Sequence, residues 1–255
     1  MPVSLMQIAV AGAGKTYNAL TFPKCYHMSF GRDEEDTINF NPILKANLVK
    51  TVSMLPLDIV DIKRKFDIDN QRQAEFCKCI DEARRMFKAG EIETLVIDPV
   101  SFMAEMIWIL IEEYHPVYTK DGKVDILRTY GVLRSKLTRL FILEIINFPG
   151  NVVVNAHLKV EDEEVLKGLP QAERENPYVP SILGGIRHEI KSWFSLVAYL
   201  EKVEKQGGYE YLARTNLGNQ KIAKSRYPNL PMICSNLSYK LIMDSKNKVV
   251  NQKVA

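Results

Sequence analysis

The sequence predicts an α/β fold in which a mostly parallel sheet is flanked by helices and extended by an antiparallel hairpin near the C-terminal end. Short apolar runs rich in β-branched residues alternate with longer segments of helical period. These runs are mostly apolar, which is typical of strands buried on both faces of a parallel sheet. A turn with two glycines at residues 11–14 also joins the first run directly to a helical segment.

Apolar periodicity predicts the elements of the first half of the chain. Pro23 ends the first expected helix and Gly90 ends the second. The second helix places Phe76, Ile80 and Phe87 on one stripe, so it is amphipathic. The expected strands are residues 5–10, 25–30, 48–55 and 94–98, and the expected helices are residues 15–22 and 72–89.

The second half continues the alternation and then changes character. A helix, a polar loop at 118–123 and a long helix with Leu133 and Leu137 facing inward lead to an apolar strand at 151–157. Residues 158–182 contain three prolines and no clear period, so we expect a long functional loop there. A hairpin and one more antiparallel strand are expected beyond it, at residues 195–203, 209–217 and 220–227.

The composition is that of a folded protein, with 46% hydrophobic and 25% charged residues over 255 positions. The formal net charge of +3 is too small to prove a polyanionic partner. Residues 213–255, however, carry eight Lys and Arg against the single acid Asp244, which suits phosphate or nucleic acid. A solvated basic tail is the alternative. We expect one domain over 1–235 and a basic C-terminal tail over 236–255.

The cysteines and the apolar segments bear on the compartment. The four cysteines fit no paired metal spacing, so we expect reduced thiols rather than a zinc site. No signal peptide is recognisable, and the longest apolar stretch, residues 106–111, is far too short to cross a bilayer. The sequence therefore predicts a soluble, cytoplasmic protein without a membrane partner.

The segment AVAGAGKT, residues 9–16, carries the most specific signal in the chain. It matches the relaxed P-loop pattern, with Ala9 in place of the usual first glycine. A glycine-containing turn between a buried strand and a helix presents backbone amides to a polyphosphate. Lys15 would neutralise the β- and γ-phosphates, and the Thr16 hydroxyl would bind Mg²⁺. The predicted nucleotide-binding residues are Ala11, Gly12, Ala13, Gly14, Lys15 and Thr16.

Two later strands end on polar residues that could complete such a site. Asp98 closes the strand TLVID, where it would hold Mg²⁺ together with Thr16; an ordinary helix cap is the alternative. His157 closes the strand NVVVNAH, and Asn155 lies two residues earlier on the same face. This pair could sense the γ-phosphate, although a lone histidine is more often structural.

These motifs together resemble the RecA-like ATPase core of recombinases, RadA-type proteins and replicative helicases. The resemblance covers roughly residues 5–231 and is closest to compact phage-encoded RecA-like proteins, some of which act in single-strand annealing and recombination. The strings that carry it are AVAGAGKT, TFPK, TLVIDPVSFM, NVVVNAHLK and AKSRYPNLP.

The resemblance implies roles for further residues. His157 takes the place of the sensor residue, and Lys224 and Arg226 resemble a pair that reaches the ATP of a neighbouring subunit. Residues 158–183 and 116–125 take the places of the two DNA-binding loops. The family's water-orienting glutamate falls near Gly31, so Glu34 or Glu35 would have to serve.

The function expected from these observations is that of an ATPase that uses ATP and Mg²⁺ and acts on single-stranded DNA as a ring or filament. It would work in phage-type recombination or replication, in the host cytoplasm if the protein is phage-encoded. A nucleotide-switched scaffold that binds a protein partner is the first alternative, and a small-molecule P-loop kinase is the second.

Overall fold

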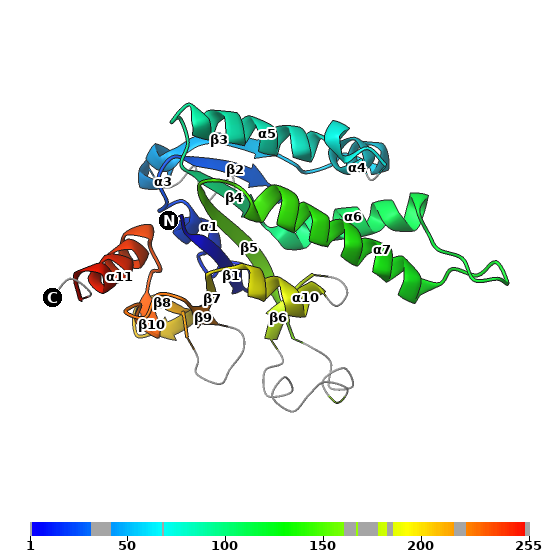
Figure 1. Ribbon diagram of the computed structural model, residues 1–255. Helices are drawn as coiled ribbons and strands as arrows, with labels where there is room; N and C mark the ends of the chain where they lie inside the picture. Colours follow the sequence, from blue (N-terminus) through cyan, green and yellow to red (C-terminus); the bar gives the residue numbers. More distant parts are fainter. Residues whose placement is uncertain are drawn as a thin grey trace.

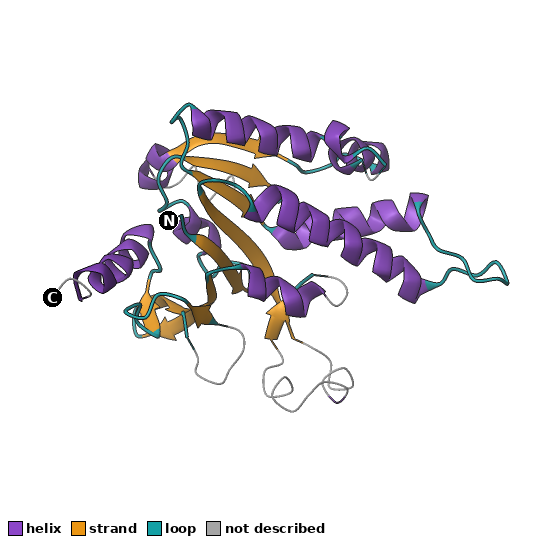
Figure 2. Ribbon diagram, in the orientation of Figure 1, coloured by secondary structure: helices purple, strands orange, loops and turns teal. Residues whose placement is uncertain are grey.

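A computed structural model describes residues 2–31, 42–67, 69–160, 167, 178–182, 186–216 and 223–252. Helices cover both faces of a twisted sheet (Figures 1 and 2). The described strands are β1 (Ser4–Ala9), β2 (Cys25–Ser29), β3 (Leu48–Ser53), β4 (Thr94–Asp98), β5 (Asn151–Val160), β6 (Tyr178–Pro180), β7 (Leu196–Lys205), β8 (Gly208–Arg214), β9 (Lys224–Ser225) and β10 (Ile233–Ser235). The described helices are α1 (Lys15–Ala19), α3 (Pro42–Asn47), α4 (Ile59–Phe66), η1 (Gln71–Gln73), α5 (Glu75–Lys88), α6 (Val100–Tyr114), α7 (Ile126–Arg139), η2 (Leu140–Ile146), α10 (Ile186–Glu189), η3 (Ile190–Trp193) and α11 (Tyr239–Gln252).

The strand order confirms the predicted α/β class. The main path of the sheet runs β10-β8-β7-β1-β5-β4-β2-β3, with β6 paired to β5 and β9 paired to β7. From β7 to β3 all neighbours are parallel, whereas β8, β10, β9 and β6 pair antiparallel. The antiparallel extension therefore lies at the C-terminal end of the chain, as expected. One strand, β5, separates β1 from β4.

Side chains alternate between two hydrophobic clusters, one on each face of the sheet. In β1, Met6 and Ile8 join the larger cluster, which α4, α5, α6 and α7 cover. Leu5 and Ala9 face the smaller cluster, which contains residues of α1 and α11. Gln7 lies two positions after Leu5, so the same alternation directs its polar side chain to the face of the sheet that α1 covers.

Helices α6 and α7 run side by side and project beyond the sheet (Figure 1). The rings of Trp108 and Tyr130 stack between them, with centroids 4.4 Å apart. Leu133 and Leu137 are fully buried, as their spacing predicts, and α7 continues without a break into the π-helix η2. None of the helices in the described ranges is long and apolar enough to span a membrane.

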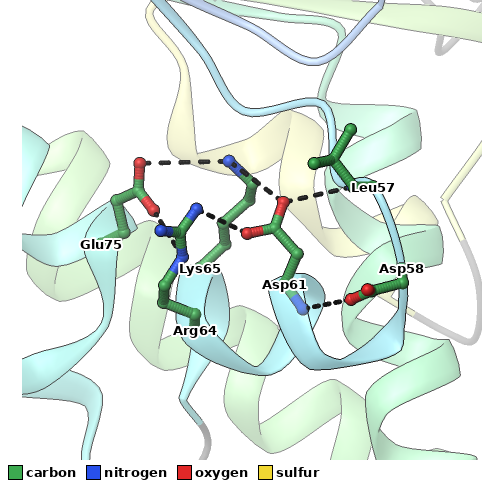
Figure 3. A network of polar contacts seen from close by, with 6 residues as sticks. All are labelled: Leu57, Asp58, Asp61, Arg64, Lys65 and Glu75. Atoms are coloured by element: carbon green, nitrogen blue, oxygen red, sulfur yellow. Dashed lines mark hydrogen bonds and ion pairs between the residues drawn. The ribbon is translucent and has the colours of Figure 1, made fainter.

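A polar network fixes the start of α4 and joins it to α5 (Figure 3). The Asp61 amide donates to the Asp58 side chain at 2.8 Å, and the Asp61 carboxylate accepts from the Leu57 amide at 3.2 Å. This reciprocal arrangement resembles a capping box. Lys65 is almost fully buried, with its ammonium 3.7 Å from the Asp61 carboxylate and 3.9 Å from that of Glu75 in α5.

The network also sets the ionisation of Asp61. Burial alone would raise the pKa of this carboxyl, but the Leu57 amide, together with Lys65 and Arg64, lowers it below its ordinary value of 3.8. Charged partners and hydrogen bonds to the ionised form outweigh desolvation here. The Asp61 carboxylate is therefore ionised across the neutral range and stabilises the α4–α5 junction.

Two parts of the sequence interpretation require correction. Residues 158–182 are not a loop throughout, because Leu158, Lys159 and Val160 continue β5 and pair with β6; residues 161–166, 168–177 and 183–185 lie outside the described residues. The segment expected to be a basic tail contains α11. Leu237, just before this helix, and Ile242, within it, are buried in the smaller cluster. Apolar packing rather than charge therefore determines where α11 lies.

Candidate functional site

A glycine turn joins β1 to α1. Gly12 and Gly14 have φ angles of +72° and +85°, which side chains with a Cβ rarely adopt. The turn therefore reverses the chain within four residues and opens into the pocket, which Ala11, Gly12 and Gly14 line. The Ala13 side chain instead packs into the smaller cluster and anchors the turn.

Lys15 begins α1 and points back over the turn. Its ammonium donates to the carbonyl oxygens of Ala9, at 3.2 Å, and Val10, at 2.9 Å. Lys15 is 7% exposed and lines the pocket. The cation is thus held beside the concave side of the turn by neutral acceptors, which an anion can replace more favourably.

Thr16 and Asp98 meet although they are 82 residues apart. The Thr16 hydroxyl donates to the Asp98 carboxylate at 2.8 Å. Asp98 stands at the carboxyl end of β4 and is 1% exposed. Burial alone would raise the pKa of Asp98, but the neighbouring His27, Thr16 and Asn155 side chains hold it below the ordinary value. A buried, ionised carboxylate beside a hydroxyl is suited to binding a hard cation.

A cluster of buried polar side chains lies beneath this pair. The Gln7 amide donates to the Asn155 side chain at 3.1 Å and to the Lys15 carbonyl at 3.3 Å. The His27 Nε2 atom is 3.7 Å from Asp98, beyond hydrogen-bond distance. Gln7, His27 and Asn155 are fully buried, and within the described part of the chain Gln7 Oε1 and His27 Nδ1 lack hydrogen-bond partners.

These polar residues were only partly recognisable from sequence. Asn155 was singled out at its strand end, but Gln7 and His27 were not. The available signal was a polar residue inside an otherwise apolar strand. Unpartnered buried polar atoms are costly, so their presence beneath a turn points to a functional site.

The turn opens into a pocket of about 560 Å³. It extends from the end of β4, through the turn, to the antiparallel strands on the other side of β1. Among the described residues, Asp98 is the only acid and Lys15 the only Lys or Arg that lines it. The lining residues are Ala11, Gly12, Gly14, Lys15, Thr16, Tyr17, Asn18, Gly31, Asp98, Phe102, His157, Tyr211 and Asn236.

His157 lines this pocket, although β5 continues for three residues beyond it rather than ending there as expected. It is in register with Ala9 of β1, and its backbone amide donates to the Ser101 hydroxyl at 2.9 Å. The Phe102 ring meets the His157 ring edge-on, with centroids 5.0 Å apart and an angle of 83°. These contacts orient the imidazole at the end of the pocket nearest Asp98.

Lys224 and Arg226 do not lie in the pocket of their own chain. They belong to the β9 segment, where the Arg226 amide donates to Ser195 and Ser195 bonds to Ser4 at the start of β1. β1 runs from Ser4 to Ala9, about 17 Å, before the glycine turn begins. The Lys224 ammonium donates to the Ser192 carbonyl at 3.1 Å, and burial, reinforced by Arg226, lowers its pKa.

Two predicted residues lie outside the described ranges, and two residues that line the pocket were not predicted. Glu34 and Glu35 lie outside the described residues, although Gly31, three positions before Glu34, lines the pocket. Tyr211 and Asn236 line the pocket without having been predicted. Neither belongs to a recognisable motif, and both reach the site only because the antiparallel strands fold back beside β1.

Comparison with known proteins agrees with this geometry. A search of curated proteins finds no match. A family model described as an AAA domain matches residues 1–227, which include the glycine turn, Asp98, His157 and Tyr211. Because this match covers far more than half of the chain, the protein belongs to the AAA-domain family and is a P-loop NTPase.

Proposed function

We propose that the protein binds ATP with Mg²⁺ and hydrolyses it. The observation that carries this proposal is the hydrogen bond of 2.8 Å between Thr16 and Asp98 at the base of the glycine turn. A hydroxyl next to a carboxylate at this place is the protein's share of a magnesium–nucleotide site in P-loop enzymes. The rest of the pocket supplies what a polyphosphate needs.

Each residue of the turn has a defined task in this proposal. The backbone amides of residues 11–14 hold the phosphates, and Lys15 exchanges its carbonyl partners for phosphate oxygens. Thr16 and Asp98 hold Mg²⁺, which neutralises charge on the phosphates. The described residues contain no group of three or more His, Cys, Asp or Glu that could hold a metal, which suits Mg²⁺ because it takes most ligands from phosphate and water.

Hydrolysis also requires a group that orients water. We assign this task to Glu34 or Glu35, since Gly31 lines the pocket just before them, and we assign the sensing of the γ-phosphate to His157. Glu34→Gln and Glu35→Gln should be made separately. The variant that loses the essential carboxylate should keep its affinity for ATP and lose turnover, whereas full turnover in both variants would contradict the assignment.

Assembly of several copies would complete the site. Lys15 is the only Lys or Arg that lines the described part of the pocket, whereas phosphoryl transfer commonly uses a second cation on the developing charge. Lys224 and Arg226, remote from their own pocket, are the proposed donors to a neighbouring copy in a ring or filament.

Mixing two inactive variants tests this donation. Lys15→Ala protein lacks a working pocket but keeps Arg226, and Arg226→Ala protein has the reverse defect. Each alone should turn over little ATP, and their mixture should recover part of the activity if the cation acts between copies. A mixture no more active than its components, in a wild type that does assemble, would contradict donation in trans.

We further propose that the ATPase acts on single-stranded DNA in recombination or replication of the phage type. The basic segment 213–255, with eight Lys and Arg against Asp244, supports a polyanionic partner. ATP turnover should rise when single-stranded DNA is added, and the effect should decline steeply with salt. Absence of both DNA binding and stimulation at low salt would reject the proposed action on single-stranded DNA. A separate test is Lys15→Ala, which should lose ATP turnover with its fold intact.

A nucleotide-switched scaffold is the second candidate. It is favoured by one observation, that Asp98 is the only acid lining the described part of the pocket. In that case ATP binding, rather than its hydrolysis, would control binding of a protein partner. Gel filtration with ATP, ADP and no nucleotide distinguishes the candidates, because a scaffold changes its assembly state without turnover. A small-molecule kinase is less well supported, since no arginine lines the described pocket.

A further inference from the structure

The pocket is longer than the phosphate-binding turn. Asp98 at the end of β4 and Thr16 in α1 mark the end proposed to bind the metal, whereas Tyr211 lines the pocket from β8. In the sheet, β8 and β4 are four strand positions apart with β1 near the middle, a separation of about 19 Å. The space on the β8 side therefore lies beyond the phosphates, where a nucleoside would extend.

Tyr211 forms a flat aromatic wall on that side. A Cβ atom built on Gly14 would lie 3.5 Å from Tyr211 Cδ1, so the ring packs directly beside the glycine turn. Tyr211 is 37% exposed, which leaves part of the ring open to the pocket. Its cross-strand neighbour Lys202 has its ammonium 6.0 Å from the Tyr211 ring centroid and 3.7 Å from that of Tyr209.

Asn236 lies beside Tyr211 and is held in place from two sides. Its backbone amide donates to the Tyr211 carbonyl at 3.3 Å, and its φ of +53° turns the chain from β10 toward α11. The next residue, Leu237, is fully buried. The Tyr239 amide then donates to the Thr21 hydroxyl after α1 at 3.0 Å, and Figure 1 shows α11 continuing from this point.

We propose that Tyr211 and Asn236 form the nucleobase subsite and select adenine. The base stacks on the open part of the Tyr211 ring, and the Asn236 amide, which offers both a donor and an acceptor, pairs with the adenine edge. Asn236 lies beyond the residues that the AAA-domain model matches. The C-terminal segment, expected from sequence to be a tail, thus supplies part of the ligand site. This inference rests on the proposed function, because it presumes a nucleoside triphosphate in the turn.

The test measures the dissociation constants of Mg-ATP and of inorganic tripolyphosphate by calorimetry. Tyr211→Ala should weaken ATP binding by about 5- to 150-fold, the effect of losing one base–aromatic stack. Tripolyphosphate, which has no base, should bind to this variant as it does to wild type. Tyr211→Phe keeps the ring and should restore ATP affinity. Tyr209→Ala is the matched control, since Tyr209 is on the same face of the hairpin but does not line the pocket.

Base selectivity tests the second residue. Asn236→Gly removes the amide and tolerates the positive φ, so it should reduce the preference for ATP over GTP without changing tripolyphosphate affinity. An unchanged preference would remove Asn236 from the subsite.

Four results, two for Tyr211→Ala and two for the wild type, separate the outcomes. ATP affinity unchanged in Tyr211→Ala would overturn the inference. An equal loss of ATP and tripolyphosphate affinity would also overturn it, because Tyr211 would then act by supporting Gly14. A wild type that binds neither ligand would refute the proposed function itself, whereas a wild type that binds ATP but not tripolyphosphate would support a contribution from the nucleoside.

Discussion

Gly150, which immediately precedes β5, offers a sharp test of the packing that positions the site. Its replacement by alanine would bring a Cβ atom to 2.5 Å from the Glu93 carbonyl oxygen, 2.7 Å from a Phe87 ring carbon and 2.8 Å from a Phe148 ring carbon. All three distances are shorter than real Cβ contacts. Gly150 has no positive φ, so its backbone conformation alone would allow alanine with a harmless or mildly stabilising effect.

The neighbours of Gly150 cannot easily move away. The Glu93 carbonyl oxygen accepts a hydrogen bond of 2.9 Å from the Asn151 amide. The Phe87 and Phe148 rings pack edge to face with centroids 5.6 Å apart. Overpacking of this kind typically costs about 1–3 kcal/mol, and with three close contacts we expect about 3 kcal/mol. The midpoint of thermal unfolding should fall by roughly 6–12 °C.

Gly131 is the matched control for this substitution. It lies inside α7, and a Cβ atom there would meet nothing within 4 Å. Gly131→Ala should therefore stabilise the protein by about 0.5–1 kcal/mol through helix propensity. Urea unfolding followed by circular dichroism measures both variants. Equal stability of Gly150→Ala and wild type, with Gly131→Ala raised as expected, would refute the close packing before β5.

Three other predictions concern charge, metal and thiols. Asp61→Asn should lower the free energy of unfolding at pH 7 by about 1–2 kcal/mol. Because the pKa of Asp61 is lowered in the folded state, the wild type should lose this advantage as the pH falls below about 4. The urea midpoints of the variant and the wild type, plotted against pH, should therefore converge there. Thr16→Val should reduce the Mg²⁺-dependent gain in ATP affinity by about tenfold or more, whereas Thr16→Ser should keep it; titrations with Mg²⁺ and with EDTA measure the difference. Burial raises the pKa of Cys25 and of Cys77 to about 12, so at pH 8 mass spectrometry after brief alkylation should find the half-buried Cys79 and Cys234 modified before these two.

The carboxyl ends of parallel strands meet at one edge of a sheet. That rule predicted from sequence that Thr16, Asp98 and His157 would lie close together, and all three line one pocket; their roles in binding and catalysis stay predictions. The rule could not identify Gln7 and His27, since their place beneath the turn depends on which face of which neighbouring strand they occupy. The lateral order of strands is set by packing between distant segments, which periodicity does not report.

The missed elements are those whose stability depends on distant partners. Helix α11 buries Ile242, and Tyr239, Leu241 and Met243 pack partly buried against the same cluster. Four apolar residues within five positions do not give a helical stripe. The position of α11 depends on contacts with the end of α1. Helix α4 has only eight residues, but it carried a local signal, since Asp58 and Asp61 have the spacing of a helix cap.

The bond between Thr21 and Tyr239 joins residues that are 218 positions apart, and the rings of Phe22 and Tyr239 pack at 4.9 Å. During synthesis the segment around α1 therefore emerges 218 residues before its packing partner. The Asn236 side of the pocket is completed only after this second segment has been synthesised. A ribosome-bound nascent chain that ends before residue 236 would present the turn and Tyr211 without Asn236.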